Sequence, residues 1–257
     1  MQATDPSYSL VLVAASFLMS AVGAYCALAA AGVAREMGGQ VSKLNAALAG
    51  LALGGVGIWS MHFLGMMAWD IGTPAGYRPA ETVASFALAV GASMLALGYM
   101  AAGPFSYKRL LISGPLAGLG VAAMHFVGMA SVRFSGYLQW NYGIVLLAIL
   151  IAVVTATVAL WLAFSVRGAW RRVAASLVMA LAVCTMHYTG MGAADVICFT
   201  GGGYRGVPGL LYRGDLLTMV VTVAVAVVAL IGMDVLFQRI VRATDLGVRT
   251  GAIAARR

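Results

Sequence analysis

Three short strings in this chain combine the residue types that bind soft metal ions. They read Met61-His62-Phe63-Leu64-Gly65-Met66, Met124-His125-Phe126-Val127-Gly128-Met129 and Met186-His187-Tyr188-Thr189-Gly190-Met191. Together they contain all 3 histidines of the 257-residue chain. Imidazole is the commonest metal ligand in proteins, and its combination with thioether sulfur favours copper over zinc, magnesium or manganese. The strings therefore predict a copper site, with the metal as Cu(I) or Cu(II).

Helical spacing ranks the candidate ligands. A residue four positions after a histidine lies on the same helix face, so each histidine and the methionine after it form the better pair, and the methionine before it is expected to pack. The predicted ligands are His62, His125, His187, Met66, Met129 and Met191, with Met61, Met124 and Met186 adjoining them. No carboxylate recurs in the strings, which argues against a site for hard cations. Asp70, Arg133 and Asp195, each eight residues after a histidine, are expected to shape the entrance instead.

A structural role for the strings is the alternative. A single histidine in a helix bundle is usually a packing residue, and methionine is a flexible core filler. Duplication alone could preserve such a packing motif. Three copies that hold every histidine of the chain favour the metal site. The three cysteines, Cys26, Cys184 and Cys198, show no disulfide framework and are expected to be small buried hydrophobes.

The composition places these strings in a membrane. Hydrophobic residues make up 62% of the chain and charged residues 9%, with a mean hydropathy of +0.96. Seven apolar runs are long enough to cross a bilayer as helices, and continuous runs of this kind disfavour a β-barrel. The seven predicted spans cover residues 8–34, 44–69, 81–103, 110–132, 141–166, 172–197 and 215–237. We therefore predict an all-α polytopic bundle, with residues 1–237 as one membrane domain and 238–257 as a short basic tail.

The basic residues predict the orientation of the bundle. Of the 16 lysines and arginines, 12 fall on one side of the seven spans and 4 on the other. Cytoplasmic loops carry the excess of positive charge, so the N-terminus is expected outside and the C-terminus in the cytoplasm. The net charge of +8 is thus read as membrane topology, and no nucleic-acid partner is predicted. Trp59 and Trp69 are expected to anchor the outer interface.

The histidines mark a three-fold internal repeat. They are 63 and 62 residues apart, which is two spans per repeat. Three two-helix repeats of this kind share one orientation, and the motif helices 44–69, 110–132 and 172–197 all run from the cytoplasm outward. The histidines are therefore expected at one depth in the outer half of the membrane, around a pseudo-three-fold axis. The seventh helix lies outside the repeat and is expected on its flank.

The strings also carry a family resemblance. The third copy reads Met186-His187-Tyr188-Thr189, and the chain resembles the bacterial MHYT-domain integral membrane sensors, although the first two copies have phenylalanine in place of tyrosine. The resemblance implies a multi-pass protein of the bacterial cytoplasmic membrane that binds copper near its outer face through the ligands named above. It further implies a response to oxygen, carbon monoxide or nitric oxide. Many relatives are fused to cytoplasmic domains that make or break cyclic di-GMP. No loop of this chain has room for such a domain, so either a separate cytoplasmic signalling partner reads the state of the site or this stand-alone form does something else, and a homo-oligomer is compatible with the pattern.

Two other classes of function remain open from the sequence. One is a copper-handling transporter or a copper-dependent, oxygen-activating membrane enzyme, although no catalytic residue is predicted. The other is a haem protein in which two histidines at one depth ligate one iron. A sensory or regulatory role is favoured over catalysis.

Overall fold

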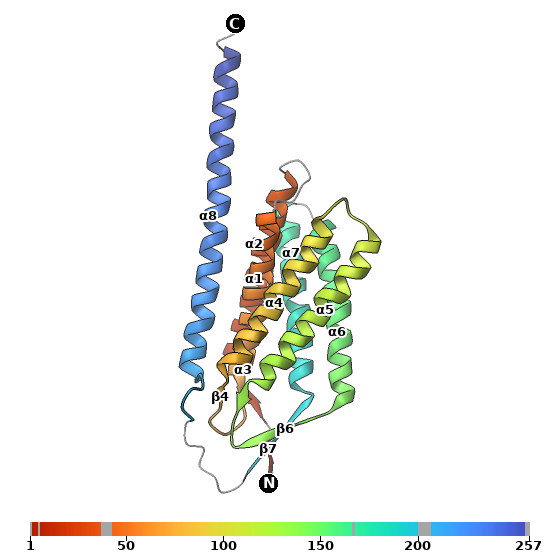
Figure 1. Ribbon diagram of the computed structural model, residues 1–257, viewed down its shortest axis with the longest axis vertical. Helices are drawn as coiled ribbons and strands as arrows, with labels where there is room; N and C mark the ends of the chain where they lie inside the picture. Colours follow the sequence, from red (N-terminus) through yellow and green to blue (C-terminus); the bar gives the residue numbers. More distant parts are fainter. Residues whose placement is uncertain (1, 5, 37–42, 166–167, 200–206, 255–257) are drawn as a thin grey trace.

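The computed structural model describes residues 2–4, 6–36, 43–165, 168–199 and 207–254. Seven helical segments of this part are long and apolar enough to cross a membrane, as predicted. They run roughly along one direction, with the two chain termini at opposite ends of the molecule (Figure 1). The helices are α1 (Leu10–Glu36), α2 (Lys43–Leu51), η1 (Ala52–Ser60), α3 (Met61–Ala68), α4 (Pro79–Ala101), α5 (Tyr107–Ala130), α6 (Tyr142–Ser165), α7 (Ala169–Met191) and α8 (Arg213–Ala254). Here α2, η1 and α3 form one continuous span.

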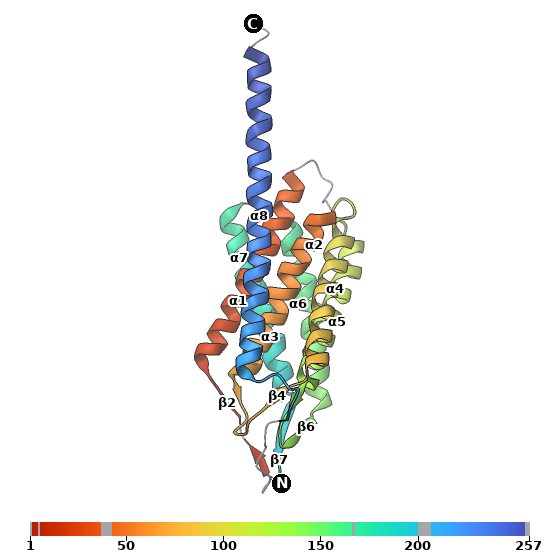
Figure 2. The ribbon, with the colours of Figure 1, turned by 60° about the vertical axis from the view of Figure 1, so that its left-hand side comes forward.

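One of the seven spans, the sixth, differs from its predicted bounds by more than a few residues. The sixth was predicted to run to residue 197, but α7 ends at Met191 and residues Ala194–Cys198 form a strand. These residues include two β-branched side chains and pair with strands on both sides, which favours the extended conformation. The last span covers Arg213–Phe237, close to its predicted bounds, and its helix continues past the span to Ala254, well beyond the rest of the bundle (Figure 2).

Six spans form a closed ring in which leading helices and motif helices alternate. Going around the ring, α1 contacts η1, the α2 end of that span contacts α4, and α4 contacts α5. The ring closes through α6 and α7 back to α1. Inside it, the three motif helices α3, α5 and α7 contact one another in pairs. This is the predicted pseudo-three-fold arrangement, and α8 lies on its outside against η1, α1 and α3.

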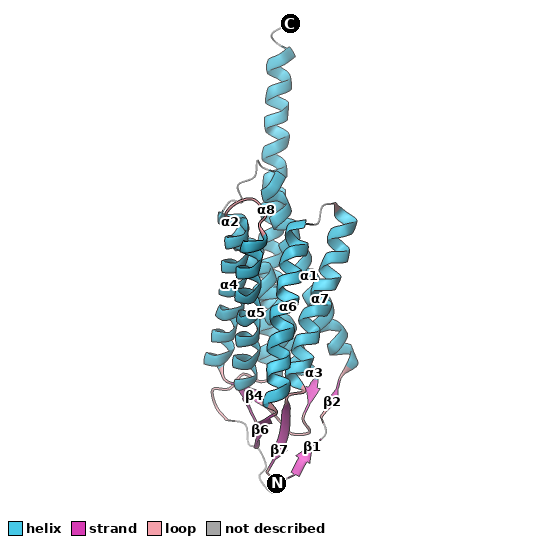
Figure 3. Ribbon diagram, turned by 90° about the vertical axis from the view of Figure 1, so that its right-hand side faces the viewer, coloured by secondary structure: helices cyan, strands magenta, loops and turns pink. Residues whose placement is uncertain are grey.

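Short strands cover the end of the ring at which the N-terminus lies, which we call the strand end (Figure 3). Each motif helix leads into one of them: β3 (Trp69–Asp70), β5 (Val132–Arg133) and β7 (Ala194–Cys198). All three pair antiparallel with other short strands, β3 with β2 (Ser7–Tyr8), β5 with β4 (Gly76–Tyr77), and β7 with both β1 (Gln2–Thr4) and β6 (Gly136–Trp140). The strands therefore tie the ends of the three motif helices to other parts of the chain.

The first motif helix contains a π-helical segment, η1, which the other two motif helices lack. In η1 the Ser60 hydroxyl donates a hydrogen bond of 2.9 Å to the carbonyl of Gly55. Trp59, expected at the membrane interface, is instead fully buried. Its indole N–H contacts the Thr82 carbonyl at 3.3 Å and the Ser85 hydroxyl at 3.1 Å, so this polar group is satisfied inside the bundle. Trp69 is likewise buried, so the interface interpretation was wrong for both residues.

Candidate metal centre

The three histidines meet on the axis of the ring. His62 on α3, His125 on α5 and His187 on α7 are each fully buried, as expected from helices that contact one another in pairs. Their Nδ1 atoms form a triangle with sides of 3.0 Å (His62–His187), 3.1 Å (His62–His125) and 3.2 Å (His125–His187). We call this cluster the histidine triad. Its position four to six residues before the ends of the motif helices confirms the prediction of one common depth.

Hydrogen bonding alone cannot satisfy the triad. A short N···N contact needs one nitrogen that carries a hydrogen and one that offers a lone pair, and each Nδ1 of a neutral imidazole is one or the other. Three atoms in mutual contact cannot alternate in this way, so at least one pair must be two donors or two acceptors. If all three hydrogens are on Nε2, three lone pairs converge on the centre of the triangle. That arrangement suits a bound cation.

The triangle also has the right size for a metal ion. Its centre lies about 1.8 Å from each Nδ1, as the three sides require, and metal–nitrogen distances in histidine sites are about 2.0–2.1 Å. The spacing of the three nitrogens is therefore compatible with one metal ion held by His62, His125 and His187. A water molecule would not fit, because its hydrogen bonds to nitrogen are about 2.7–3.2 Å long. Among the described residues, the triad is the group of His, Cys, Asp or Glu side chains whose ligand atoms lie close enough to one another to hold a metal ion.

Each imidazole rests on a glycine of the neighbouring motif helix. The glycine three positions after one histidine faces the ring of another: Gly128 faces His62, Gly190 faces His125 and Gly65 faces His187. A Cβ placed on these glycines would collide with Nε2 of the facing ring and lie 2.8–2.9 Å from its Cδ2. Each histidine ring therefore contacts the glycine of the next motif helix, in the same sense around the axis. A residue with a Cβ would prevent this contact.

Packing rather than hydrogen bonding holds the outer side of each ring. The three Nε2 atoms are buried and have no hydrogen-bond partner among the residues that the structure describes. On the other side, each ring meets the aromatic side chain that follows it, with centroid separations of 4.8 Å (His62–Phe63), 5.0 Å (His125–Phe126) and 4.7 Å (His187–Tyr188). Glycine on one side and an aromatic ring on the other thus fix where each Nδ1 points.

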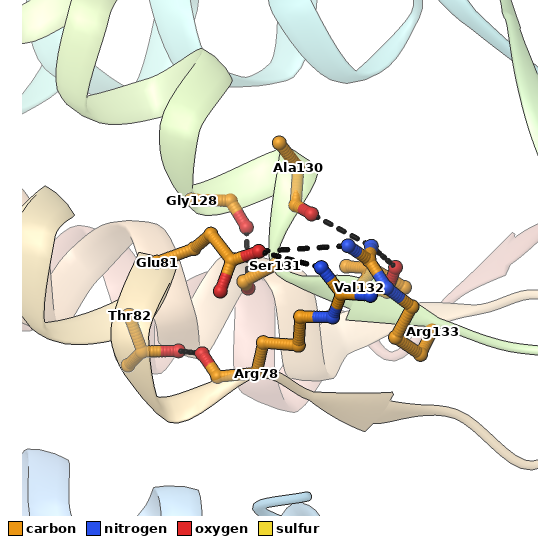
Figure 4. Close-up of polar contacts among 8 residues, drawn as sticks. All are labelled: Arg78, Glu81, Thr82, Gly128, Ala130, Ser131, Val132 and Arg133. Carbon is orange, nitrogen blue, oxygen red and sulfur yellow. Dashed lines mark hydrogen bonds and ion pairs between the residues drawn. The ribbon is translucent and has the colours of Figure 1, made fainter.

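Polar contacts fix the glycine that faces His62 (Figure 4). The carbonyl of Gly128 accepts hydrogen bonds from the Ser131 hydroxyl at 2.6 Å and the Ser131 amide at 3.1 Å. Just beyond it, Arg133 donates to the carbonyls of Ala130 and Val132 and pairs with Glu81 on α4 at 3.5 Å. These contacts close the end of α5 and attach it to α4.

The candidate methionines are all buried, with exposed fractions of 0–2%. They are Met61, Met66, Met124, Met129, Met186 and Met191. Five of them, all but Met61, belong to the same hydrophobic core cluster at this level of the ring. Sulfur ligation by Met66, Met129 and Met191 stays a prediction.

The charged residues predicted near the triad lie in the strand layer, and the phenols around it lie on strands and on α7. Asp70 and Asp195 are exposed on β3 and β7, and Arg133 is half-buried on β5, so none of them belongs to the triad. Burial raises the pKa of Tyr8 to about 12, with the nearby Tyr188 phenol adding to the effect, and burial also raises the pKa of Tyr77 to about 12. Tyr8 and Tyr77 therefore stay protonated at neutral pH and offer no anionic oxygen. Tyr188 contacts the Ser16 hydroxyl at 3.0 Å through its own hydroxyl.

Comparison with known proteins matches this architecture to one family. Residues 55–113 and 118–176 match the family model MHYT, described as a bacterial signalling protein N-terminal repeat. Both matched segments begin seven residues before a triad histidine, in agreement with the repeat read from the sequence. No solved structure matches the chain.

Curated relatives carry names from bacterial signalling, two of them from cyclic di-GMP signalling. The chain is 38% identical over 231 residues to the bifunctional diguanylate cyclase/cyclic di-GMP phosphodiesterase MucR of Pseudomonas aeruginosa, which covers 87% of this chain and 33% of the relative. It is 34% identical over 196 residues to the cyclic di-GMP phosphodiesterase NbdA of the same organism, covering 73% of this chain and 24% of the relative. It is 29% identical over 195 residues to the signaling protein YkoW of Bacillus subtilis, a match that covers 73% of this chain and 24% of that relative. The chain thus spans a third or less of the length of these relatives.

Proposed function

The chain belongs to the MHYT family of bacterial signalling proteins, and on that premise we propose that it is a membrane sensor whose histidine triad binds one copper ion. The observation that carries the proposal is the Nδ1 triangle, with sides of 3.0–3.2 Å, because three buried imidazole nitrogens at this spacing suit a bound cation and cannot all satisfy one another by hydrogen bonding. The ligands are His62, His125 and His187, completed by the sulfur of a downstream methionine. Seven helices that are long and apolar enough to cross a bilayer support a site within the membrane.

The charge and the softness of the ligands favour Cu(I). The triad contains no carboxylate, so the ligands do not neutralise the ion. The energy needed to move an ion out of water rises with the square of its charge, so a monovalent ion is far less costly here than Zn²⁺. Thioether sulfur adds to the preference for Cu(I).

The alternatives raised by the sequence fit the site less well. A porphyrin needs room between its two axial histidines, whereas the three Nδ1 atoms lie within 3.2 Å of one another in a closed core. Transport needs further sites along the membrane, and in the described ranges only the triad brings three His, Cys, Asp or Glu side chains close enough to hold a metal ion. A catalytic role would require a substrate to reach the metal.

We assign one part of the structure to the loading of the metal and another to the output of the signal. A groove of about 430 Å³ at the strand end is lined by Met129, Arg133 and Trp140, and we propose it as the route by which copper reaches the triad. For the output, α8 packs against α3, which carries His62, and against η1 of the same span. A change at the metal, such as binding of oxygen, carbon monoxide or nitric oxide, would move these segments and therefore α8. The long extension of α8 would pass that movement to a cyclic di-GMP enzyme of the kind named among the relatives, or to a separate partner.

Metal analysis of the purified protein tests the proposal. We expect one copper per chain after loading with Cu(I) under anaerobic conditions, and loss of this copper when His62, His125 and His187 are all changed to Ala. The matched control is Gly98→Ala, because Gly98 faces open space and Ala does not disturb it. Protein that takes up no copper, or equal loading of the triple variant, would refute the proposal. An intense Soret band in protein as isolated would assign the site to haem instead.

A further inference from the structure

An apolar cavity lies on the axis of the ring next to the histidine triad. Its volume is about 50 Å³, and all six spans of the ring contribute to its lining. Ile58, Val121 and Val183 line it from the three motif helices. Each of them lies four residues before a triad histidine, which is one helical turn or about 6 Å along the axis. The cavity and the metal centre are therefore neighbours on the same pseudo-three-fold axis.

The lining makes the cavity unsuitable for water. It is built from aliphatic side chains and methionine apart from Ser93 and Thr155. The Thr155 hydroxyl is already directed to the carbonyl of Ala152 at 3.4 Å. A buried water needs two to four polar partners, whereas dry apolar cavities bind apolar atoms and molecules such as xenon. A volume of about 50 Å³ suits an occupant of two heavy atoms rather than a lipid chain or a quinone ring.

A second feature connects this cavity to the lipid. Between α6 and α7, a groove of about 260 Å³ opens on the outer surface of the ring, where Val154, Val158 and Val178 are exposed. Four residues line both the groove and the cavity: Thr155, Ala159, Met179 and Ala182. Three of the four have small side chains, so the wall between lipid and cavity is one thin layer.

We propose that the axial cavity binds a single small, uncharged, apolar molecule of the dioxygen class, which enters from the lipid between α6 and α7. Such molecules are more soluble in hydrocarbon than in water, and the groove shares part of its wall with the cavity. From the cavity, the occupant is one helical turn from the Nδ1 atoms. The proposal rests on the proposed function for its consequence, since the cavity supplies the gas to which the copper would respond.

Crystals of the metal-free protein under xenon pressure test the cavity without reference to copper. We expect an anomalous xenon peak between Ile58, Val121 and Ala156, and its loss in Ala156→Leu, which fills the cavity. The matched control is Ala87→Leu on the exposed face of α4, which should keep the peak. An empty cavity in the wild type, an ordered lipid chain or water in it, or a peak unchanged by Ala156→Leu would overturn the proposal.

Carbon monoxide binding to the Cu(I)-loaded protein tests the route. Ala182→Leu narrows the wall shared by groove and cavity, and we expect association of carbon monoxide to slow by about tenfold with copper content unchanged. The control Ala87→Leu should bind at the wild-type rate. Equal rates in the wild type and Ala182→Leu would overturn entry between α6 and α7. If the protein holds no copper, the proposed function fails while the xenon experiment still decides the cavity.

Discussion

Adding one methyl group at Gly128 should remove one ligand from the metal centre. In Gly128→Ala the new Cβ would collide with Nε2 of His62 and lie 2.9 Å from its Cδ2. Because carbon atoms pack at about 3.5–4.0 Å, the ring must retreat by roughly 1 Å. Its Nδ1, now about 1.8 Å from the centre of the triangle, would then lie at about 2.8 Å, too far for a metal–nitrogen bond of about 2.0–2.1 Å.

The loss should appear in copper affinity more than in folding. We expect Cu(I) affinity, measured by competition with a chelator of known affinity, to fall by about 100-fold or more. Overpacking of this kind destabilises a core by about 1–3 kcal/mol, which thermal unfolding in detergent would report. Gly65→Ala and Gly190→Ala should behave alike, because they face His187 and His125 in the same manner.

A control variant and a double variant separate the effect on copper binding from the effect on stability. Gly98→Ala is the control, since a Cβ there meets nothing within 4 Å and should leave both copper affinity and stability intact or slightly improved. The double variant Gly128→Ala/His62→Ala removes the collision and should recover stability relative to Gly128→Ala while still binding copper weakly. If Gly128→Ala binds copper as tightly as the wild type, the reasoning that glycine positions the imidazoles is wrong.

Three other predictions concern the surroundings of the triad. Met129→Leu conserves volume, so stability should change by less than about 1.5 kcal/mol, while Cu(I) affinity in the chelator assay falls by about tenfold through loss of the sulfur; unchanged affinity would argue against ligation by this methionine. Trp59→Phe removes the N–H that contacts Thr82 and Ser85 and should lower thermal stability by about 1–3 kcal/mol with copper content unchanged; no loss of stability would show that these contacts contribute nothing. Glu81→Gln breaks ion pairs that are partly exposed, so we expect a loss of about 0–1 kcal/mol that shrinks at high salt; a larger, salt-independent loss would contradict the exposed geometry.

The membrane spans and the meeting of the histidines could be predicted because both follow from long-range regularities. An apolar run of span length has few alternatives to a membrane helix. A repeat of two spans places equivalent residues at one depth, so His62, His125 and His187 had to lie at the same level. The side-chain directions followed from the helical period, which places a histidine and the glycine three positions later on neighbouring flanks of one face.

Local irregularities escaped prediction because they depend on contacts that no period reveals. The π-helical segment η1 shifts the first motif helix by one residue, and only the structure shows this shift. Leu53 lines the axial cavity nine residues before His62, whereas Ala117 and Met179 line it eight residues before His125 and His187. The strands at the strand end are two to five residues long and exist only as pairs. Trp59 was misplaced for a similar reason, since its buried partners Thr82 and Ser85 come from another span.

The pairing of rings and glycines also lay beyond the sequence. Each motif carries its own glycine, and the simplest expectation is that a histidine and its glycine serve the same helix. In the structure His62 instead uses Gly128 of the next motif helix, and the exchange continues around the axis. This depends on the rotation of the three helices relative to one another, which is set by the whole ring.

The odd number of imidazoles in the triad should lower the stability of the metal-free protein. Two neutral imidazoles can share an N–H···N hydrogen bond, but three in mutual contact leave one pair unmatched, so the metal-free triad is destabilised by its own geometry. A glutamine in place of His125 supplies both a donor and an acceptor and removes the mismatch. Metal-free His125→Gln should therefore be as stable as the metal-free wild type or more stable by up to about 1 kcal/mol.

Copper should reverse this order. At a free concentration 100 times its dissociation constant, a ligand stabilises the native state by about 2.7 kcal/mol, and the variant with one nitrogen ligand fewer gains much less. Thermal unfolding of both proteins with and without Cu(I) would show the two orders directly. If metal-free His125→Gln unfolds several degrees below the metal-free wild type, the three rings satisfy one another without a cation, and the argument that their contacts call for a metal fails.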